Sequence, residues 1–222
     1  MESKSRKDAE RVLMSLRSEG IIKREVVLKA MLNVPREEFV PEEYKAHAYE
    51  DMPIPIGEGQ TVSALHMVAM MCELTELKPG MNVLEVGTGS GYMASVYSEI
   101  VGKYGHVYTL EILPSLAKKA WRNIVKIGHG PNVDVIVADG SIEPPLRIEF
   151  DAIIVAASAP NLPEELIKKL KKNGKMIVPV GSSDFYQNLI LVEKDNKGLV
   201  RTYNLGPVAF VPLKGLKGSS NA

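Results

Sequence analysis

Residues 83–92 restrict the folds open to this chain more than any other stretch, and their sequence is VLEVGTGSGY. An apolar run that carries one acid, Glu85, leads directly into three glycines at alternate positions, Gly87, Gly89 and Gly91. This order predicts a buried strand, a tight turn and the start of a helix. Glycine permits positive φ and lets backbone N–H groups approach a ligand at the open end of a helix. The stretch therefore predicts a loop for a nucleotide-like ligand, although a lone glycine-rich turn also occurs as a purely structural feature.

Apolar runs alternate with helical patterns from residue 83 to residue 180. Strands are expected at 83–86, 106–111, 133–137, 151–156 and 175–180, and helices at 92–101, 114–127 and 164–171. This alternation predicts an α/β fold with a doubly wound, mostly parallel, Rossmann-like sheet and helices on both faces. Two further strands, at 188–193 and 206–211, predict an antiparallel hairpin at the edge of that sheet.

The residues before the sheet predict an N-terminal helical extension. Helices are expected at 5–19 and 24–32, followed by an extended, turn-rich wrap that contains Pro35 and Pro41. A polar loop at 55–67 then enters an apolar helix that continues to Leu74. We expect one domain over 1–222, made of the extension (1–80), the ligand-binding sheet core (81–213) and a frayed Gly- and Ser-rich tail (214–222).

Composition limits the class of protein. The chain has 222 residues, of which 45% are hydrophobic, and its 27 Lys and Arg balance 27 Asp and Glu, so a basic surface for nucleic acid is not expected. Cys72 is the only cysteine, and no apolar run approaches the roughly 20 residues of a membrane span. We therefore expect a cytoplasmic protein with no membrane or nucleic-acid partner and a monomer as the default. The four histidines and one cysteine show no metal-ligand spacing, so no metal is expected.

Two acidic positions strengthen the ligand hypothesis. Glu111 ends the strand after the glycine loop, where doubly wound folds place an acid near ribose hydroxyls. Asp139 and Gly140 follow the next strand, at the same predicted edge of the sheet. The glycines are spaced G-x-G-x-G, whereas the dinucleotide fingerprint is G-x-G-x-x-G. The spacing therefore favours S-adenosylmethionine (AdoMet) over NAD.

Several of these residues also have a purely structural interpretation. Ser63 and Thr61 stand at a helix entry, where hydroxyls are commonly caps. A histidine on an otherwise apolar face, such as His66, is more often a core residue with satisfied hydrogen bonds than a catalyst. Asp139 taken alone is as consistent with a turn residue as with a ligand contact. The small residues at 157–160 follow the strand expected at 151–156. They are consistent with the mouth of a site, where bulky side chains would obstruct a ligand.

A second motif, at residues 56–63, combines Gly57, Gly59, Gln60, Thr61, Val62 and Ser63 and is followed by His66 and Met67. Further matching stretches are 34–41, 48–51, 83–92, 150–155, 179–181 and 210–213. Together these resemble the protein-L-isoaspartate O-methyltransferases, a family of class I AdoMet-dependent methyltransferases, over residues 10–213. The chain departs from the family pattern at Leu65, at Ser158 and at Asn173-Gly174.

The resemblance implies an activity and a set of site residues. It implies methyl transfer from AdoMet to the free carboxylate of L-isoaspartyl residues in damaged proteins and peptides, with D-aspartyl residues as a further candidate substrate. The ester then closes to a succinimide, which begins repair, and the other product is S-adenosylhomocysteine (AdoHcy). The implied cofactor-binding residues are Gly87, Thr88, Gly89 and Gly91 on the methionine part, Glu111 on the ribose, and Asp139 and Gly140 at the adenine. The implied substrate-binding residues are Gln60, Thr61, Val62 and Ser63, with Ser63 as the catalytic residue.

Other functions remain open at this point. A tRNA adenine methyltransferase can share the glycine loop and the acid, but it needs a basic groove and leaves 59–63 unexplained. A module that binds AdoMet without turnover is a further possibility. An NAD-dependent oxidoreductase is disfavoured by the glycine spacing.

Overall fold

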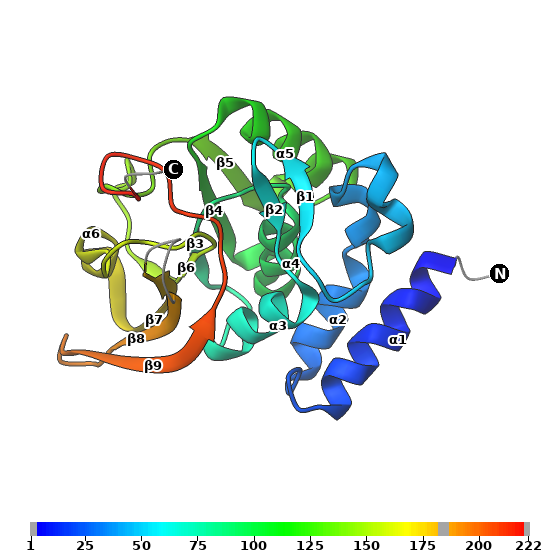
Figure 1. Ribbon diagram of the computed structural model, residues 1–222. Coiled ribbons are helices and arrows are strands. Elements are labelled where there is room, and N and C mark those ends of the chain that lie inside the picture. The colour runs from blue at the N-terminus through cyan, green and yellow to red at the C-terminus, as the bar shows by residue number, and fades with distance from the viewer. Residues whose placement is uncertain (1–3, 182–186, 220–222) are drawn as a thin grey trace.

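A seven-stranded sheet runs through the middle of the protein, with helices packed against it (Figure 1). The structure, a computed structural model, describes residues 4–181 and 187–219. In chain order the strands are β3 (Asn82–Val86), β4 (His106–Glu111), β5 (Val133–Val137), β6 (Phe150–Val155), β7 (Leu170–Val180), β8 (Gln187–Lys194) and β9 (Val200–Val208). Their spatial order is β5-β4-β3-β6-β7-β8-β9. Strands β3 to β7 run parallel to one another, while β8 is antiparallel to both of its neighbours, β7 and β9. The predicted fold class is confirmed.

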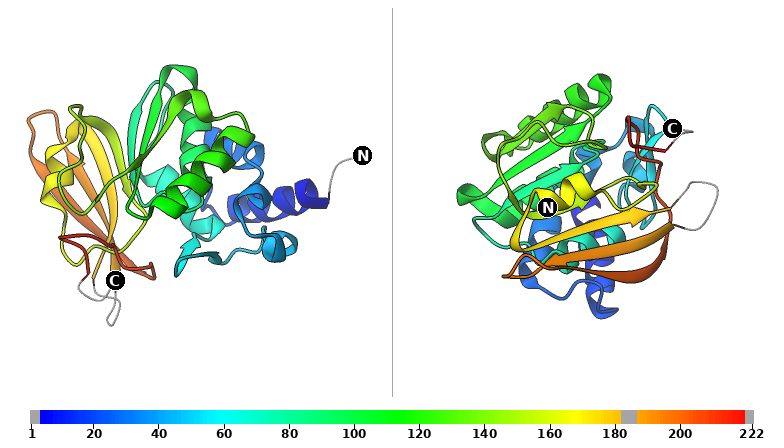
Figure 2. Two further views of the ribbon diagram at one scale, coloured as in Figure 1. Left: turned by 90° about the horizontal axis from the view of Figure 1, so that it is seen from above. Right: turned by 90° about the vertical axis from the view of Figure 1, so that its left-hand side faces the viewer.

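Helices cover both faces of the sheet (Figure 2). They are α3 (Leu65–Leu74), α4 (Tyr92–Val101), α5 (Pro114–Lys126) and α6 (Glu164–Lys168), with short 3₁₀ turns η3 (Gly102–Tyr104) and η4 (Gly130–Asn132). Successive β3 side chains point to opposite faces, so Val83 joins the core beneath α3 and α4 whereas Leu84 joins the core beneath α6. The near-continuous burial of β3 and β6 is what a strand covered on both faces requires.

The N-terminal residues form an outer helical layer. The layer contains α1 (Lys4–Ser18), α2 (Glu25–Asn33), η1 (Arg36–Phe39) and η2 (Glu42–His47). Helix α1 packs on α2, which packs on α3 and α4. Arg24 ties this layer to α3 by an ion pair to Glu73 at 2.8 Å. The helical extension is confirmed, but the segment expected to be an irregular wrap contains two 3₁₀ helices.

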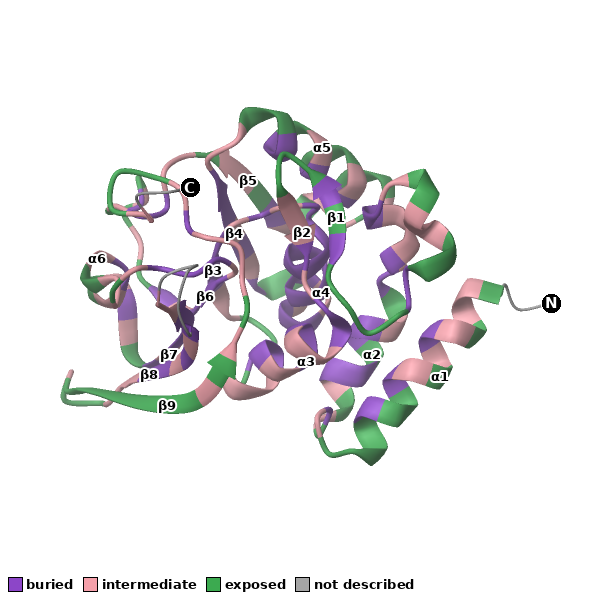
Figure 3. Ribbon diagram, viewed as in Figure 1, coloured by how far each residue is buried: buried purple, intermediate pink, exposed green. Residues whose placement is uncertain are grey.

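Two expected elements differ because pairing with neighbouring strands overrides local preference. The helix expected over 164–171 ends at Lys168, because the chain from Leu170 pairs with β6 and runs on through Asn173 and Gly174 as part of β7. The last strand begins at Val200 rather than at 206. Val200 follows the turn after β8 and pairs with Lys194 across it. Most of β9 is exposed (Figure 3). A strand shows an alternation of apolar residues when one of its faces is buried, so the sequence of β9 does not mark it as a strand.

The polar loop expected over 55–67 is also partly regular. Strand β1 (Ile54–Gly57), which begins one residue before it, and β2 (Gln60–Val62) form a small antiparallel ribbon apart from the main sheet. The expected frayed tail is wrong for residues 214–219, because the Leu216 N–H donates to Asp139 Oδ2 at 2.8 Å. Residues 220–222 lie outside the described part of the chain. Within that part, no helix has the length and apolar character needed to cross a membrane.

The direction of winding reverses at β3, whose neighbours are β4 on one side and β6 on the other. Ligands of open α/β sheets bind outside the carboxyl ends of the strands at such a reversal. The fold therefore directs attention to the residues that follow β3, β4 and β6.

Candidate active site

The glycine loop folds over the carboxyl end of the sheet immediately after β3. The backbone N–H groups of Gly87 and Thr88 both donate to the Leu110 carbonyl, at 2.9 and 3.3 Å. Gly87 and Gly89 have φ of +93° and +55°, values that residues with a Cβ rarely adopt. Both glycines line a pocket at this edge.

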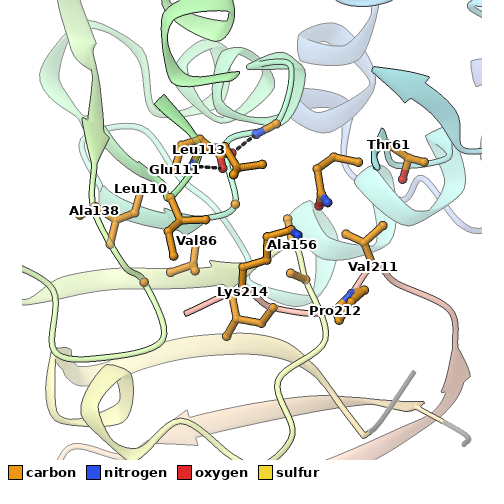
Figure 4. Close-up of a pocket in the computed structure, with 17 residues that line it drawn as sticks. Thr61, Val86, Leu110, Glu111, Leu113, Ala138, Ala156, Val211, Pro212 and Lys214 are labelled. Atoms are coloured by element: carbon orange, nitrogen blue, oxygen red, sulfur yellow. Dashed lines mark hydrogen bonds between the residues drawn. The ribbon is translucent and has the colours of Figure 1, made fainter. Parts of the chain in front are cut away.

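Glu111, at the end of β4, is fastened to the same loop. Its Oε2 accepts a hydrogen bond from the Gly89 N–H at 2.9 Å and its Oε1 accepts one from the Leu113 N–H at 3.1 Å (Figure 4). The residue is 6% exposed. Burial raises the pKa of Glu111, while hydrogen bonds from Gly89, Leu113 and Ile112 oppose that rise. The carboxylate is thus held rigidly in the wall of the pocket.

The pocket is partly open to solvent, and the space within it, including the open part, is about 520 Å³. It combines apolar walls with the Glu111 carboxylate and the glycine backbone. Its lining residues are Gln60, Thr61, Val86, Gly87, Gly89, Leu110, Glu111, Ile112, Leu113, Ala138, Gly140, Ala156, Ala157, Val211, Pro212, Leu213 and Lys214. Apolar side chains for a nucleobase, a carboxylate for hydroxyls and glycine backbone that a ligand can approach closely suit a nucleoside such as AdoMet. We call this space the first pocket.

A second pocket adjoins the first. It is lined by Pro53, Thr61, Ser63, Ala64, His66, Met67, Ala156, Pro207, Val208, Ala209, Phe210 and Val211. Thr61, Ala156 and Val211 belong to both pockets, so these three residues mark where the pockets meet. Ser63 lines only the second pocket, immediately before the start of α3.

His66 is not a buried core histidine. Its side chain is 38% exposed and its Nδ1 lies 2.9 Å from Asp51 Oδ2, while its backbone N–H donates to Asp51 Oδ1 at 2.9 Å. The Asp51 carboxylate is thus the hydrogen-bond partner of one ring nitrogen of His66, and it orients the ring beside the second pocket. The core interpretation of His66 is therefore wrong.

Two residues of the expected substrate-binding segment lie away from the second pocket. Gln60 faces the first pocket. Val62 is buried and pairs with Ile54 across the β1–β2 ribbon.

Three residues expected at the cofactor do not line the first pocket. The Thr88 hydroxyl is buried and lies 2.6 Å from the Thr109 hydroxyl. Gly91 has φ of +88°, and a Cβ there would lie 3.0 Å from Ile124, so this glycine lets α4 begin against α5. Asp139 turns away toward Ser141 and the C-terminal segment, whereas its neighbours Ala138 and Gly140 do line the pocket.

Glu85 lies beneath the glycine loop and is fully buried. Its Oε2 accepts a hydrogen bond from Thr109 at 2.5 Å, and its Oε1 has no hydrogen-bond partner among the described residues. Burial raises the pKa of Glu85 to about 8, with the Thr109 hydrogen bond opposing and the nearby Glu111 adding to the rise. Glu85, Thr109 and Thr88 thus form a buried chain of polar side chains that ends in the loop.

The C-terminal contribution to the first pocket was not assigned from the sequence. Residues 211–214 lie far along the chain from the glycine loop, yet they line the same pocket. The only signal was the matching stretch at 210–213. Ser158, one of the departures from the family pattern, helps to hold this segment, because its N–H donates to the Val211 carbonyl at 2.8 Å. Over the ranges 4–181 and 187–219, no cluster of three or more His, Cys, Asp or Glu side chains could hold a metal ion.

Comparison with known proteins agrees with this geometry. The family model described as protein-L-isoaspartate(D-aspartate) O-methyltransferase matches residues 6–218. The chain belongs to this family. Its relatives include the protein-L-isoaspartate O-methyltransferase of Methanothermobacter thermautotrophicus, 49% identical over 94% of this chain and 95% of the relative. The protein-L-isoaspartate O-methyltransferase 2 of Archaeoglobus fulgidus is 52% identical over 94% of each chain.

Solved structures of the family have the same fold. One is described as a β-aspartate methyltransferase from Plasmodium falciparum in complex with S-adenosyl-L-homocysteine. It is 31% identical to this chain, covers 93% of it and 98% of its own length, and superposes with a TM-score of 0.82. A protein-L-isoaspartate O-methyltransferase structure with a TM-score of 0.85 and 29% identity covers 95% of this chain and 67% of its own. The protein is therefore a methyltransferase of the isoaspartate family.

Proposed function

We propose that this enzyme transfers a methyl group from AdoMet to the free carboxylate of L-isoaspartyl residues in damaged proteins and peptides, which initiates repair through a succinimide. The observation that carries the proposal is the junction of the two pockets at Thr61, Ala156 and Val211. Methyl transfer needs a cofactor site and an acceptor site that adjoin each other, and the adjacency of these pockets supports this function. Family membership supports the choice of substrate.

We assign the cofactor to the first pocket. When bound, it supplies a sulfonium methyl group that an acceptor oxygen can attack, the carbon–sulfur electron pair remaining on sulfur. Gly87, Gly89 and Gly140 present backbone at the pocket surface, and Glu111 offers carboxylate lone pairs to ribose hydroxyls. In this assignment Thr88, Gly91 and Asp139 act by shaping the pocket rather than by lining it.

We assign the substrate to the second pocket, with Ser63 as the residue that orients its carboxylate. A carboxylate with an ordinary pKa near ~4 is already ionised at neutral pH, so the reaction needs no general base. What the protein must supply is alignment and the exclusion of water. The Ser63 hydroxyl can donate to one carboxylate oxygen and leave the other free to react. Gln60, Thr61 and Val62 belong to the segment that presents Ser63, and the His66–Asp51 pair lies at the same pocket.

The decisive experiment compares two peptides that differ only at one residue. An isoaspartyl peptide and its normal aspartyl counterpart are incubated with AdoMet that carries a labelled methyl group. We expect label in the first peptide and none in the second, and equal labelling of both would overturn the proposal. A D-aspartyl peptide tests the second substrate class. Binding of AdoMet without label in any peptide would indicate a binding module.

The tRNA adenine methyltransferase kept open by the sequence is not supported by the comparisons, whose relatives at high coverage carry the isoaspartate methyltransferase name. A cytoplasmic location, a monomeric state and a single domain over 1–222 are also proposals. Cell fractionation tests the first, gel filtration tests the second, and one cooperative unfolding transition is the expectation for the third.

A further inference from the structure

The segment that follows β9 forms one wall of the first pocket. Leu213 and Lys214 line the pocket together with Val211 and Pro212, and Figure 4 shows Val211, Pro212 and Lys214 on one side of it and Glu111 on the other. At one end this wall is attached to Ser158, which accepts a hydrogen bond from the Leu213 N–H at 2.9 Å and donates one to the Val211 carbonyl at 2.8 Å.

The other end of the wall is attached to the turn that follows β5. Asp139 Oδ1 accepts hydrogen bonds from the N–H and hydroxyl of Ser141, at 2.8 and 2.6 Å. Asp139 Oδ2 accepts one from the Leu216 N–H at 2.8 Å, and the Ser141 hydroxyl accepts one from the Lys217 N–H at 3.0 Å. Two side chains of the turn thus bind two consecutive backbone N–H groups of the C-terminal segment.

Gly215 lies at the point of closest approach between the two segments. Its φ is +132°, and a Cβ at this position would overlap the Asp139 carboxylate and the Ser141 hydroxyl. A larger residue therefore cannot be accommodated without separating the segments. Burial disfavours ionisation of Asp139, but hydrogen bonds from Ser141 and Leu216 outweigh it and hold the pKa of Asp139 below its usual value.

The two attachments bracket Lys214. The segment is also held by burial of Leu213 in the core with Leu166 and by an exposed ion pair between Lys217 and Glu165 at 3.2 Å, so releasing the second attachment would loosen the wall between Leu213 and Lys217. From this geometry we propose that Asp139, Ser141 and Gly215 form a latch that holds the C-terminal wall closed over the bound cofactor. Asp139 is then a positioning residue, which retains the cofactor through the wall and is not itself part of the pocket lining. The inference rests on the proposed placement of the cofactor in the first pocket.

Two variants and one control test the latch. Gly215→Ala introduces the overlapping methyl group, and Ser141→Ala removes the hydroxyl that joins Asp139 to Lys217. The control is Gly198→Ala, because Gly198 also has a positive φ of +89° but a Cβ there would meet no atom within 4 Å. The first measurement is hydrogen exchange of residues 211–217 in the ligand-free protein, and the second is the dissociation rate of AdoHcy.

In both latch variants we expect faster exchange in residues 211–217 and dissociation of AdoHcy accelerated by about tenfold or more. The control should behave like the wild type in both measurements. Faster exchange with an unchanged dissociation rate would overturn the latch, as would unchanged exchange. Should Gly215→Ala fail to fold, the milder Ser141→Ala still decides the question.

A third variant separates failure of the latch from failure of the proposed site. If Glu111→Gln weakens AdoHcy binding but neither latch variant alters dissociation, only the latch is overturned. If Glu111→Gln leaves AdoHcy affinity unchanged, the cofactor placement itself fails and the latch falls with it.

Discussion

The Glu111 carboxylate and the Gly89 backbone are joined by a hydrogen bond of 2.9 Å between the end of β4 and the glycine loop. A second backbone N–H, from Leu113, occupies the other carboxylate oxygen at 3.1 Å. Each carboxylate oxygen has about two lone pairs, so each keeps acceptor capacity toward the pocket. Glu111 therefore orders the loop and keeps acceptor capacity toward the first pocket, where the proposed cofactor placement puts the ribose hydroxyls.

Replacing Glu111 with Gln should weaken the binding of AdoHcy by about 1–3 kcal/mol. The amide group would bring an N–H toward one of the two backbone donors and would remove the charge that strengthens hydrogen bonds to hydroxyls. Isothermal titration calorimetry measures the change. Glu143→Gln, an exposed carboxylate paired with Lys169, is the control, and equal affinities in the two variants would contradict this role for Glu111.

Replacing Ser63 with Ala should lower kcat on an isoaspartyl peptide by roughly 10- to 100-fold, because the acceptor carboxylate would lose its alignment. AdoHcy affinity should stay unchanged, since Ser63 lines only the second pocket. Steady-state kinetics and calorimetry on the same preparation test both statements. Ser15→Ala, on an exposed face of α1, is the control. A variant with full kcat would remove Ser63 from the mechanism.

Replacing Gly91 with Ala should destabilise the fold by about 1–3 kcal/mol, because the new methyl group would press on Ile124 at 3.0 Å and on the Ala120 carbonyl at 3.2 Å. Gly102→Ala is the matched control, since Gly102 also has a positive φ of +62° but open space around it. Urea unfolding of both variants separates backbone strain from packing. Similar losses in the two would mean that Gly91 is needed only for its backbone conformation.

Glu85 should make folding stability fall as pH rises. Burial raises its pKa from 4.5 to about 8, so between these values the native state keeps a proton that the unfolded chain releases. The native state then binds more protons than the unfolded state, and this group lowers the free energy of unfolding by about 1.4 kcal/mol per pH unit across that window. Glu85→Gln cannot titrate, so its stability relative to the wild type should improve from pH 5 to pH 8.

Chemical denaturation at several pH values measures this difference. Glu143→Gln serves again as the exposed control, for which the difference from the wild type should not depend on pH in this way. A difference between Glu85→Gln and the wild type that stays constant from pH 5 to pH 8 would show that Glu85 is ionised in the folded protein.

Long periodic segments were predictable because their burial is set by their own sequence. The stripe of Leu116, Ala120 and Ile124 on α5 and the apolar run of β6 each reveal which face they bury. The exposed strand β9 and the short helix α6 were not predictable in extent, because pairing with β8 and β6 decided where they begin and end. The same limit applies to the pocket lining: motif and spacing singled out Glu111, Gly87 and Gly89, which line the first pocket, but they did not single out the lining residues 211–214.

The sequence by itself determined the parallel sheet, the glycine loop at its carboxyl edge and the acid at the end of the next strand, because each depends on residues close together in the chain. Only the tertiary structure decided that Thr88 points into a buried polar chain, that Gly91 serves helix packing, and that Asp139 binds Leu216 rather than lining the pocket. The physical reason is that a side chain's partner is chosen by which segments the folded chain brings within hydrogen-bond distance. For Asp139 that partner lies 77 positions along the chain, beyond the reach of any local pattern.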